Sequence, residues 1–115
     1  MEMGNCYVAS IAVMREFKKV PDRRISLCHG HATLNGGECI GEVANHSWVE
    51  IKDNNTNEWI YLDVSPIEFG EEIIHCNRDE MYQALKIDPR LVKRYTRKHM
   101  EAMIMKHHHC GPWDI

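Results

Sequence analysis

The sequence predicts a single α+β domain over residues 1–115, in which an N-terminal helix packs on a small antiparallel sheet and C-terminal helices follow. Apolar residues recur at helical spacing near the start, at strand spacing through the middle, and at helical spacing again toward the end. The 115 residues suit one domain with one modest core, and 43% hydrophobic against 27% charged residues is typical of a soluble globular protein.

The first expected element is a helix over residues 6–19. One of its faces carries four apolar side chains at helical spacing: Tyr7, Ile11, Met14 and Phe17. Asn5 is a favourable N-cap, because its side chain can accept a hydrogen bond from a backbone N–H of the first turn. The helix has to end before Pro21, whose ring does not continue it.

The middle of the chain predicts the sheet. Residues 23–31 are expected to form a strand, and residues 34–42 a glycine-containing loop. Strands at 46–53 and 58–65 flank a polar turn and predict an antiparallel hairpin, and the ambiguous segment 68–76 leaves room for a short strand. Alternation within the hairpin predicts one apolar stripe that faces the core: Val49, Ile51, Ile60, Leu62 and Val64.

The remainder of the chain predicts helices. A short helix is expected over residues 78–86, closed near Pro89, and a longer amphipathic helix over residues 90–107. The domain therefore divides into a core, residues 4–76, and a C-terminal helical segment, residues 77–110.

Charge and hydropathy limit the expected partners and location. Net charge is −3 and no basic run stands out, so the sequence predicts no nucleic-acid-binding surface. No stretch approaches the roughly 20 apolar residues of a membrane helix, so no membrane partner is expected. The first residues, MEMGNC, lack the layout of a signal peptide, which predicts a cytoplasmic protein. The oligomeric state is left open.

Five scattered cysteines, an odd number, do not predict a disulfide framework. Two groups contain the residue types that bind metals: Cys-His-Gly-His at 28–31 with Cys39, and His-His-His-Cys at 107–110 with His75 and Cys76. Neither group has the paired spacing that is typical of structural zinc sites. The sequence therefore predicts no metal and no cofactor, and a zinc-stabilised domain is the alternative.

The turn of the hairpin predicts its register. Centring the turn on residues 54–55 places Trp48 opposite Tyr61 and His46 opposite Asp63. Directly opposed residues share one face of the sheet, with Cβ atoms about 4.5–5.5 Å apart. The His46 ring can then donate a hydrogen bond to the Asp63 carboxylate, which fixes its tautomer and stabilises its charged form. A surface cross-strand pair without chemistry is the alternative.

Cys6 opens the first helix and is the candidate nucleophile. A thiol at a helix N-terminus faces the positive end of the helix dipole and unpaired backbone N–H groups, which favour the thiolate. The backbone N–H of Cys6 can also help to hold an oxyanion. If the start of the helix meets the end of the hairpin that holds His46 and Asp63, the three side chains form a Cys-His-Asp triad.

A family resemblance rests on three segments, GNCYVAS, HSWVEI and WIYLDVS. With 40 residues from Cys6 to His46 and 17 from His46 to Asp63, they resemble the transglutaminase-like branch of the papain-like cysteine protease superfamily. The resemblance covers residues 4–65. It implies a papain-like core in which a thiolate attacks an amide or ester carbonyl and the acyl group passes to water or an amine.

The sequence departs from this family at two points. Asp63 is followed by Val-Ser where the family has Pro-Thr, which is a mild change. Relatives supply a second oxyanion donor several residues before the cysteine, and Asn5 is the nearest side-chain donor here. Asn5 is a weak choice, because capping the helix would occupy its oxygen. The calcium dependence of the cross-linking enzymes is not expected.

These observations predict a cysteine-dependent amide hydrolase or acyl-transferase, a protease or deamidase, that acts on a protein or peptide substrate through a thioester. The bond attacked would be a peptide, isopeptide or glutamine amide. Trp48 and Tyr61 share the face of the predicted pair and are expected to wall the substrate cleft or to pack in the core. The alternative is a catalytically inactive papain-like fold that acts as a protein-binding or inhibitory module.

Overall fold

A computed structural model describes residues 5–33, 41–67 and 70–113, with the side chains of residues 5 and 64–74 outside that description. The helices within these ranges are α1 (Asn5–Glu16), α2 (Arg78–Ala84) and α3 (Arg97–His107), with short 3-10 turns η1 (Asp22–Arg24) and η2 (Pro89–Leu91). The strands are β1 (Ile25–Thr33), β2 (Val43–Lys52), β3 (Trp59–Ile67), β4 (Gly70–Asn77) and β5 (Lys93–Tyr95).

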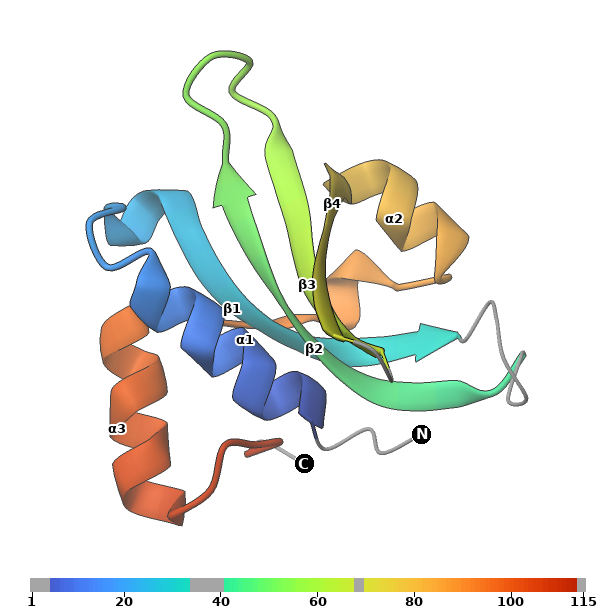
Figure 1. The fold of residues 1–115 in the computed structure, drawn as a ribbon. Coiled ribbons are helices and arrows are strands. Elements are labelled where there is room, and N and C mark those ends of the chain that lie inside the picture. The colour runs from blue at the N-terminus through green and yellow to red at the C-terminus, as the bar shows by residue number, and fades with distance from the viewer. Residues whose placement is uncertain (1–4, 34–40, 68–69, 114–115) are drawn as a thin grey trace.

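The described strands form one antiparallel sheet of five strands in the order β4-β3-β2-β1-β5 (Figure 1). α1 and α3 pack on one face of the sheet and α2 packs on the other. This arrangement confirms the predicted α+β class, with an N-terminal helix on an antiparallel sheet. None of the helices in the described ranges has the length and apolar character needed to span a membrane.

Two apolar clusters hold the layers together, one on each face of the sheet. The cluster under α1 and α3 consists of Ile11, Val13, Met14, Ile25, Leu27, Val49, Tyr95, Met100, Met103 and Trp113. The cluster under α2 consists of Cys28, Ala32, Trp48, Tyr61, Tyr82 and Ile87. Neighbouring residues on a strand point to opposite faces, so Val49 belongs to the first cluster and Trp48 to the second. From the predicted stripe, Ile51 and Leu62 pack partly buried against the first cluster, and the Val64 side chain lies outside the described residues.

α1 follows its predicted apolar face but is shorter than predicted. Tyr7, Ile11 and Met14 are buried, whereas Phe17 lies beyond the last helical residue and is 39% exposed. The helix already includes Asn5, whose side chain is outside the described part of the chain. The helical spacing therefore predicted the buried face correctly, and the end of the helix lies three residues earlier than expected.

The prediction of one helix over residues 90–107 is wrong. Residues Lys93–Tyr95 instead form β5, which adds to the edge of the sheet by pairing with β1. α3 begins only after Thr96, whose hydroxyl accepts a hydrogen bond from the backbone N–H of His99 at 3.1 Å. A three-residue strand is too short to show strand periodicity, and it forms because the edge of β1 offers it hydrogen-bonding groups.

The hairpin between β2 and β3 turns one residue later than predicted. Asp53 and Glu58 close the loop through a backbone hydrogen bond of 2.8 Å. The Asp53 carboxylate accepts hydrogen bonds from the backbone N–H groups of Asn55 and Thr56 at 2.7 and 3.1 Å. Asn57 adopts a φ of 61°, which asparagine tolerates better than most residues. The loop is therefore centred between Asn55 and Thr56.

This later turn changes the partner of every residue in the hairpin. Glu50, and not Trp48, lies opposite Tyr61, so the predicted direct pairing of His46 with Asp63 is also wrong. The register moves by two residues, however, and side chains along a strand alternate with a period of two. Each residue therefore keeps its predicted face. His46 and Asp63 become diagonal neighbours, a separation that long side chains can span.

Candidate active site

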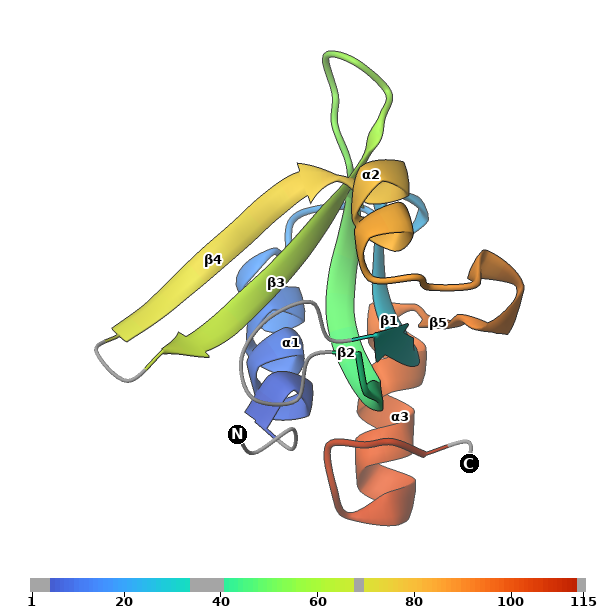
Figure 2. The same ribbon diagram turned by 90° about the vertical axis from the view of Figure 1, so that its right-hand side faces the viewer.

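The two central strands separate at the position of the candidate site. The pairing of β2 with β3 begins next to the hairpin loop, at Lys52 and Trp59, and ends at Val49 and Leu62. Farther from the loop, β2 pairs only with β1 and β3 pairs only with β4. Figure 2 shows the two strands diverging, with the N-terminal part of α1 next to the opening, and α1 contacts both strands. This divergence allows the start of the helix to approach side chains near the split.

His46 and Asp63 meet just beyond the point where β2 and β3 separate. The Nε2 atom of His46 lies 2.7 Å from Oδ2 of Asp63, and the two side chains are 13% and 16% exposed. The Tyr61 hydroxyl donates to the same Asp63 oxygen at 3.1 Å and lies 3.0 Å from Nε2 of His46. The structure therefore brings the predicted pair together and adds Tyr61 to it.

The His46 ring is held in its charged form. Burial opposes the positive charge, but hydrogen bonds and negative charge from Asp63 and Cys6 outweigh it and raise the pKa of His46 to about 9. His46 therefore carries two protons at neutral pH. Because Nε2 is hydrogen-bonded to Asp63, the buried Nδ1 atom is the ring nitrogen that can exchange a proton with the sulfur of Cys6.

Cys6 lies in the first turn of α1 and is 6% exposed. Its carbonyl accepts a hydrogen bond from the Ser10 hydroxyl at 2.7 Å, and its backbone N–H is among the first of the helix. A sulfur beside a protonated imidazole can be held as a thiolate in an ion pair. The three residues of the predicted triad, Cys6, His46 and Asp63, are thus neighbours in space.

Trp48 and Tyr61 lie in the core under α2, where both are fully buried. The Trp48 ring stacks between the rings of His46 and Tyr61, with centroid distances of 5.7 and 5.5 Å. Of the two predicted positions, core packing is therefore the one observed, and neither ring offers an exposed surface to a substrate. Burial and the charge of Asp63 raise the pKa of Tyr61, so its hydroxyl keeps its proton and acts as a donor.

The sequence reasoning missed the role of the Tyr61 hydroxyl. Tyr61 precedes Asp63 by two residues on the same strand face, which was the available signal. For the oxyanion, the backbone N–H of Cys6 lies at the start of the helix as predicted. The Asn5 side chain, predicted as a weak second donor, lies outside the described residues.

A pocket of about 210 Å³ is lined by sequence neighbours of two residues of the predicted triad. Its wall includes Tyr7, the residue after Cys6, and Asn45, the residue before His46. Lys93 of β5 also lines it. Burial and the neighbouring Cys6 raise the pKa of Tyr7 to about 12, so Tyr7 presents a neutral hydroxyl. The pocket thus combines an aromatic wall with polar and cationic groups.

Two of the other described cysteines have raised pKa values. Burial and the charge of Glu50 raise the pKa of Cys28 well above its usual range, and burial with Glu80 raises that of Cys76. Among the side chains that the structure describes, no three or more from His, Cys, Asp or Glu form a group that could hold a metal ion. Cys39, one member of the first predicted metal group, lies outside the described residues.

Comparisons of the chain with protein-family models, with curated proteins and with solved structures give no match. The interpretation of the site therefore rests on its own geometry and on the three sequence segments that contain its residues.

Proposed function

We propose that the chain is a cysteine-dependent amide hydrolase or acyl-transferase with a papain-like, transglutaminase-like core. The observation that supports this most directly is the position of His46 between Asp63 and Cys6. The Asp63 carboxylate accepts a hydrogen bond from Nε2 of His46 at 2.7 Å. Cys6 contributes to the raised pKa of the same ring. A nucleophile, a base and a group that orients the base are the parts required for nucleophilic amide cleavage.

In the proposed reaction, Cys6 attacks as a thiolate while His46 holds a proton on Nδ1. The sulfur adds to the carbonyl carbon, and the backbone N–H of Cys6 donates to the oxygen that becomes negative. His46 gives its proton to the leaving nitrogen, the C–N bond breaks and a thioester remains on Cys6. His46 then takes a proton from water, which hydrolyses the thioester. Asp63 orients the ring through Nε2 in every step.

The proposed substrate is a protein or peptide, attacked at a peptide, isopeptide or glutamine amide. The pocket lined by Tyr7, the residue after Cys6, is the proposed entry site for one substrate side chain. Its volume of about 210 Å³ is small for a second, amine-carrying substrate, which favours hydrolysis over cross-linking. A reduced nucleophile suits a cytoplasmic location.

Alkylation tests the proposed nucleophile. With iodoacetamide at pH 7, Cys6 should react at least about tenfold faster than Cys76 and Cys110 in the same molecule, as measured by peptide mapping. His46→Gln should remove this advantage, and the matched variant His75→Gln, at an exposed position on β4, should keep it. Equal rates at the three cysteines would contradict the proposal and favour the inactive binding module.

Mass spectrometry of a peptide library tests the reaction. The unaltered chain and Cys6→Ala are incubated with the same library. Shortened peptides that appear only with the unaltered chain indicate a protease, and a gain of about one dalton at glutamine indicates a deamidase. Identical spectra from the two proteins would argue against an amide hydrolase.

A further inference from the structure

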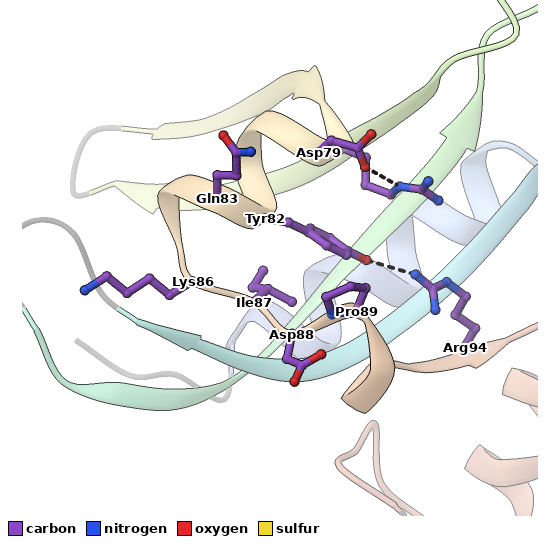
Figure 3. A pocket seen from close by; sticks show the side chains of 9 residues that line it. Asp79, Tyr82, Gln83, Lys86, Ile87, Asp88, Pro89 and Arg94 are labelled. Atoms are coloured by element: carbon purple, nitrogen blue, oxygen red, sulfur yellow. Dashed lines mark hydrogen bonds and ion pairs between the residues drawn. The ribbon is translucent and has the colours of Figure 1, made fainter.

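A second pocket, of about 570 Å³, lies under α2 on the opposite face of the sheet from α1. Figure 3 shows that Tyr82, Ile87 and Pro89 form its apolar part, with Arg94 at one side. The Arg78 side chain also lines it. This volume lies within the range of about 300–1,000 Å³ that is usual for small-molecule sites. The proposed amide chemistry makes no use of this pocket.

A buried carboxylate organises the arginines of the pocket. Glu50 is 1% exposed, and its Oε1 atom lies 3.6 Å from Nη1 of Arg78 and 3.5 Å from Nε of Arg94. Its other oxygen, Oε2, accepts hydrogen bonds from the Tyr82 hydroxyl and from Nε1 of Trp48. Arg94 donates in addition to the Tyr82 hydroxyl at 3.1 Å. Both guanidinium groups are thus held in place from the core side.

These contacts leave hydrogen-bonding capacity on the pocket side. A guanidinium has five N–H donors, and the two long ion pairs to Glu50 use only part of those of Arg78 and Arg94. The two side chains remain 27% and 38% exposed. An arginine that is fixed on one side and open on the other loses little conformational freedom when it binds an anion.

The balance of charge in the pocket is positive. Asp88 is bonded to Arg90, which lies outside the lining, through two side-chain hydrogen bonds of 3.1 and 2.9 Å. Three lining cations, Arg78, Lys86 and Arg94, then face two carboxylates, the buried Glu50 and the largely exposed Asp79.

We propose that this pocket binds a small organic anion. A carboxylate or phosphate oxygen pair would bind the guanidinium forks of Arg78 and Arg94, which match the planar geometry of such groups. The apolar body of the ligand would lie against Tyr82, Ile87 and Pro89. The site is separate from the triad, so Cys6→Ala should bind the same ligands with unchanged affinity whatever the outcome for the amide chemistry.

Calorimetric titration of the full chain tests the proposal with phenyl phosphate and benzoate as probes. At least one should bind with a dissociation constant of about 1 mM or lower, and neutral benzyl alcohol should bind at least about tenfold more weakly. Arg94→Gln should weaken the binding of the anion at least about tenfold. The matched variant Arg15→Gln, which removes an exposed guanidinium of α1 on the other face of the sheet, should keep the affinity within about twofold.

Arg94→Gln can also destabilise the fold, because Arg94 contacts the buried Glu50. A second pair of variants therefore changes a residue that does not take part in these contacts. Gln83 is exposed on α2 and lines the pocket. Gln83→Glu should lower the affinity for the anion and Gln83→Lys should raise it, each by about two- to fivefold at low salt. Any of three results would overturn the proposal: neither anion binds at about 10 mM, benzyl alcohol binds as tightly as the anions, or the two Gln83 variants bind the anion equally well.

Discussion

At the scale of single residues, the proton on His46 decides what the site can do. Burial alone would favour the neutral ring, yet Asp63 and Cys6 raise its pKa to about 9. The ring therefore enters the proposed reaction as an acid that already holds the proton for the leaving group. Asp63 contributes by position as well as by charge, because its 2.7 Å contact fixes which nitrogen faces the sulfur.

Asp63→Asn should lower the pKa of His46 by at least about one unit, because the amide keeps a hydrogen-bonding oxygen but removes the negative charge. Nitrogen chemical shifts of the imidazole, followed against pH, should give a midpoint of about 9 in the unaltered chain and a lower one in the variant. Asp79→Asn, at the largely exposed carboxylate beside Arg78, should leave the midpoint in place. An unchanged midpoint in Asp63→Asn would contradict the assignment.

The sequence predicts that the three candidate residues lie close together because each has a recognisable position in its element. Cys6 opens an amphipathic helix, and His46 and Asp63 occupy equivalent faces of two adjacent strands. The contributions of Tyr61 and Glu50 could not be predicted in the same way. They depend on which face of the sheet α2 covers, and the hairpin pattern carries no information about the position of α2.

At the scale of the elements, Arg97 connects the end of α1 to the start of α3. Its guanidinium donates to the backbone carbonyls of Met14, Phe17 and Val20 at 3.3, 2.7 and 3.2 Å and to Asp22 at 3.0 Å. The last carbonyls of a helix have no partners within the helix, so this side chain satisfies groups that would otherwise need water.

Arg97→Gln should lower the free energy of unfolding by about 1–3 kcal/mol, because several carbonyls lose a charged donor. Urea unfolding followed by circular dichroism measures the change. Arg90→Gln removes a guanidinium whose side chain is 87% exposed, and it should change the free energy of unfolding by less than about 0.5 kcal/mol. Equal effects of the two substitutions would show that Arg97 does not cap α1.

The two errors of element prediction have different physical origins. β5 was missed because Lys93–Tyr95 pair with β1, a tertiary contact that no local pattern records. The hairpin register was misplaced because the Asp53 side chain, by accepting two backbone N–H groups, closes a longer loop than the asparagine pair suggested. The faces of the described hairpin side chains were nevertheless predicted correctly, since a shift of two residues preserves alternation.

At the scale of the whole molecule, the α+β class could be predicted because periodicity reports which segments are helices and which are strands. The face of the sheet that each helix covers could not be predicted, because the apolar residues of α1 and α2 do not specify a side of the sheet. Because α1 and α2 bury opposite faces of β2, Trp48 lies in the core under α2. Cys6 reaches His46 beyond the point where β2 and β3 separate.

Stability should fall as the solution becomes alkaline. The pKa of His46 is raised from 6.5 to about 9, so the folded chain binds this proton more tightly than the unfolded chain. The resulting stabilisation is fully present below about pH 6.5 and is lost as pH rises through about 9, with an upper bound of about 3 kcal/mol. Urea unfolding at pH 6.5 and 9.5 measures the loss.

The variant His46→Gln separates this effect from the titration of other groups. Its free energy of unfolding should fall less between the two pH values than that of the unaltered chain, because glutamine does not titrate. If the chain and the variant lose the same free energy across this window, the proton on His46 does not stabilise the fold.

The position of Trp48 has an optical consequence. Its indole stacks on the His46 ring, and its Nε1 donates at 2.9 Å to Glu50, the carboxylate that holds the two arginines of the pocket under α2. Indole emission responds to a neighbouring charge and to changes in its hydrogen bond. One buried indole therefore contacts the proposed catalytic base and the carboxylate that lies behind the proposed anion site, so its fluorescence should respond to protonation of the first and to a ligand that displaces the second.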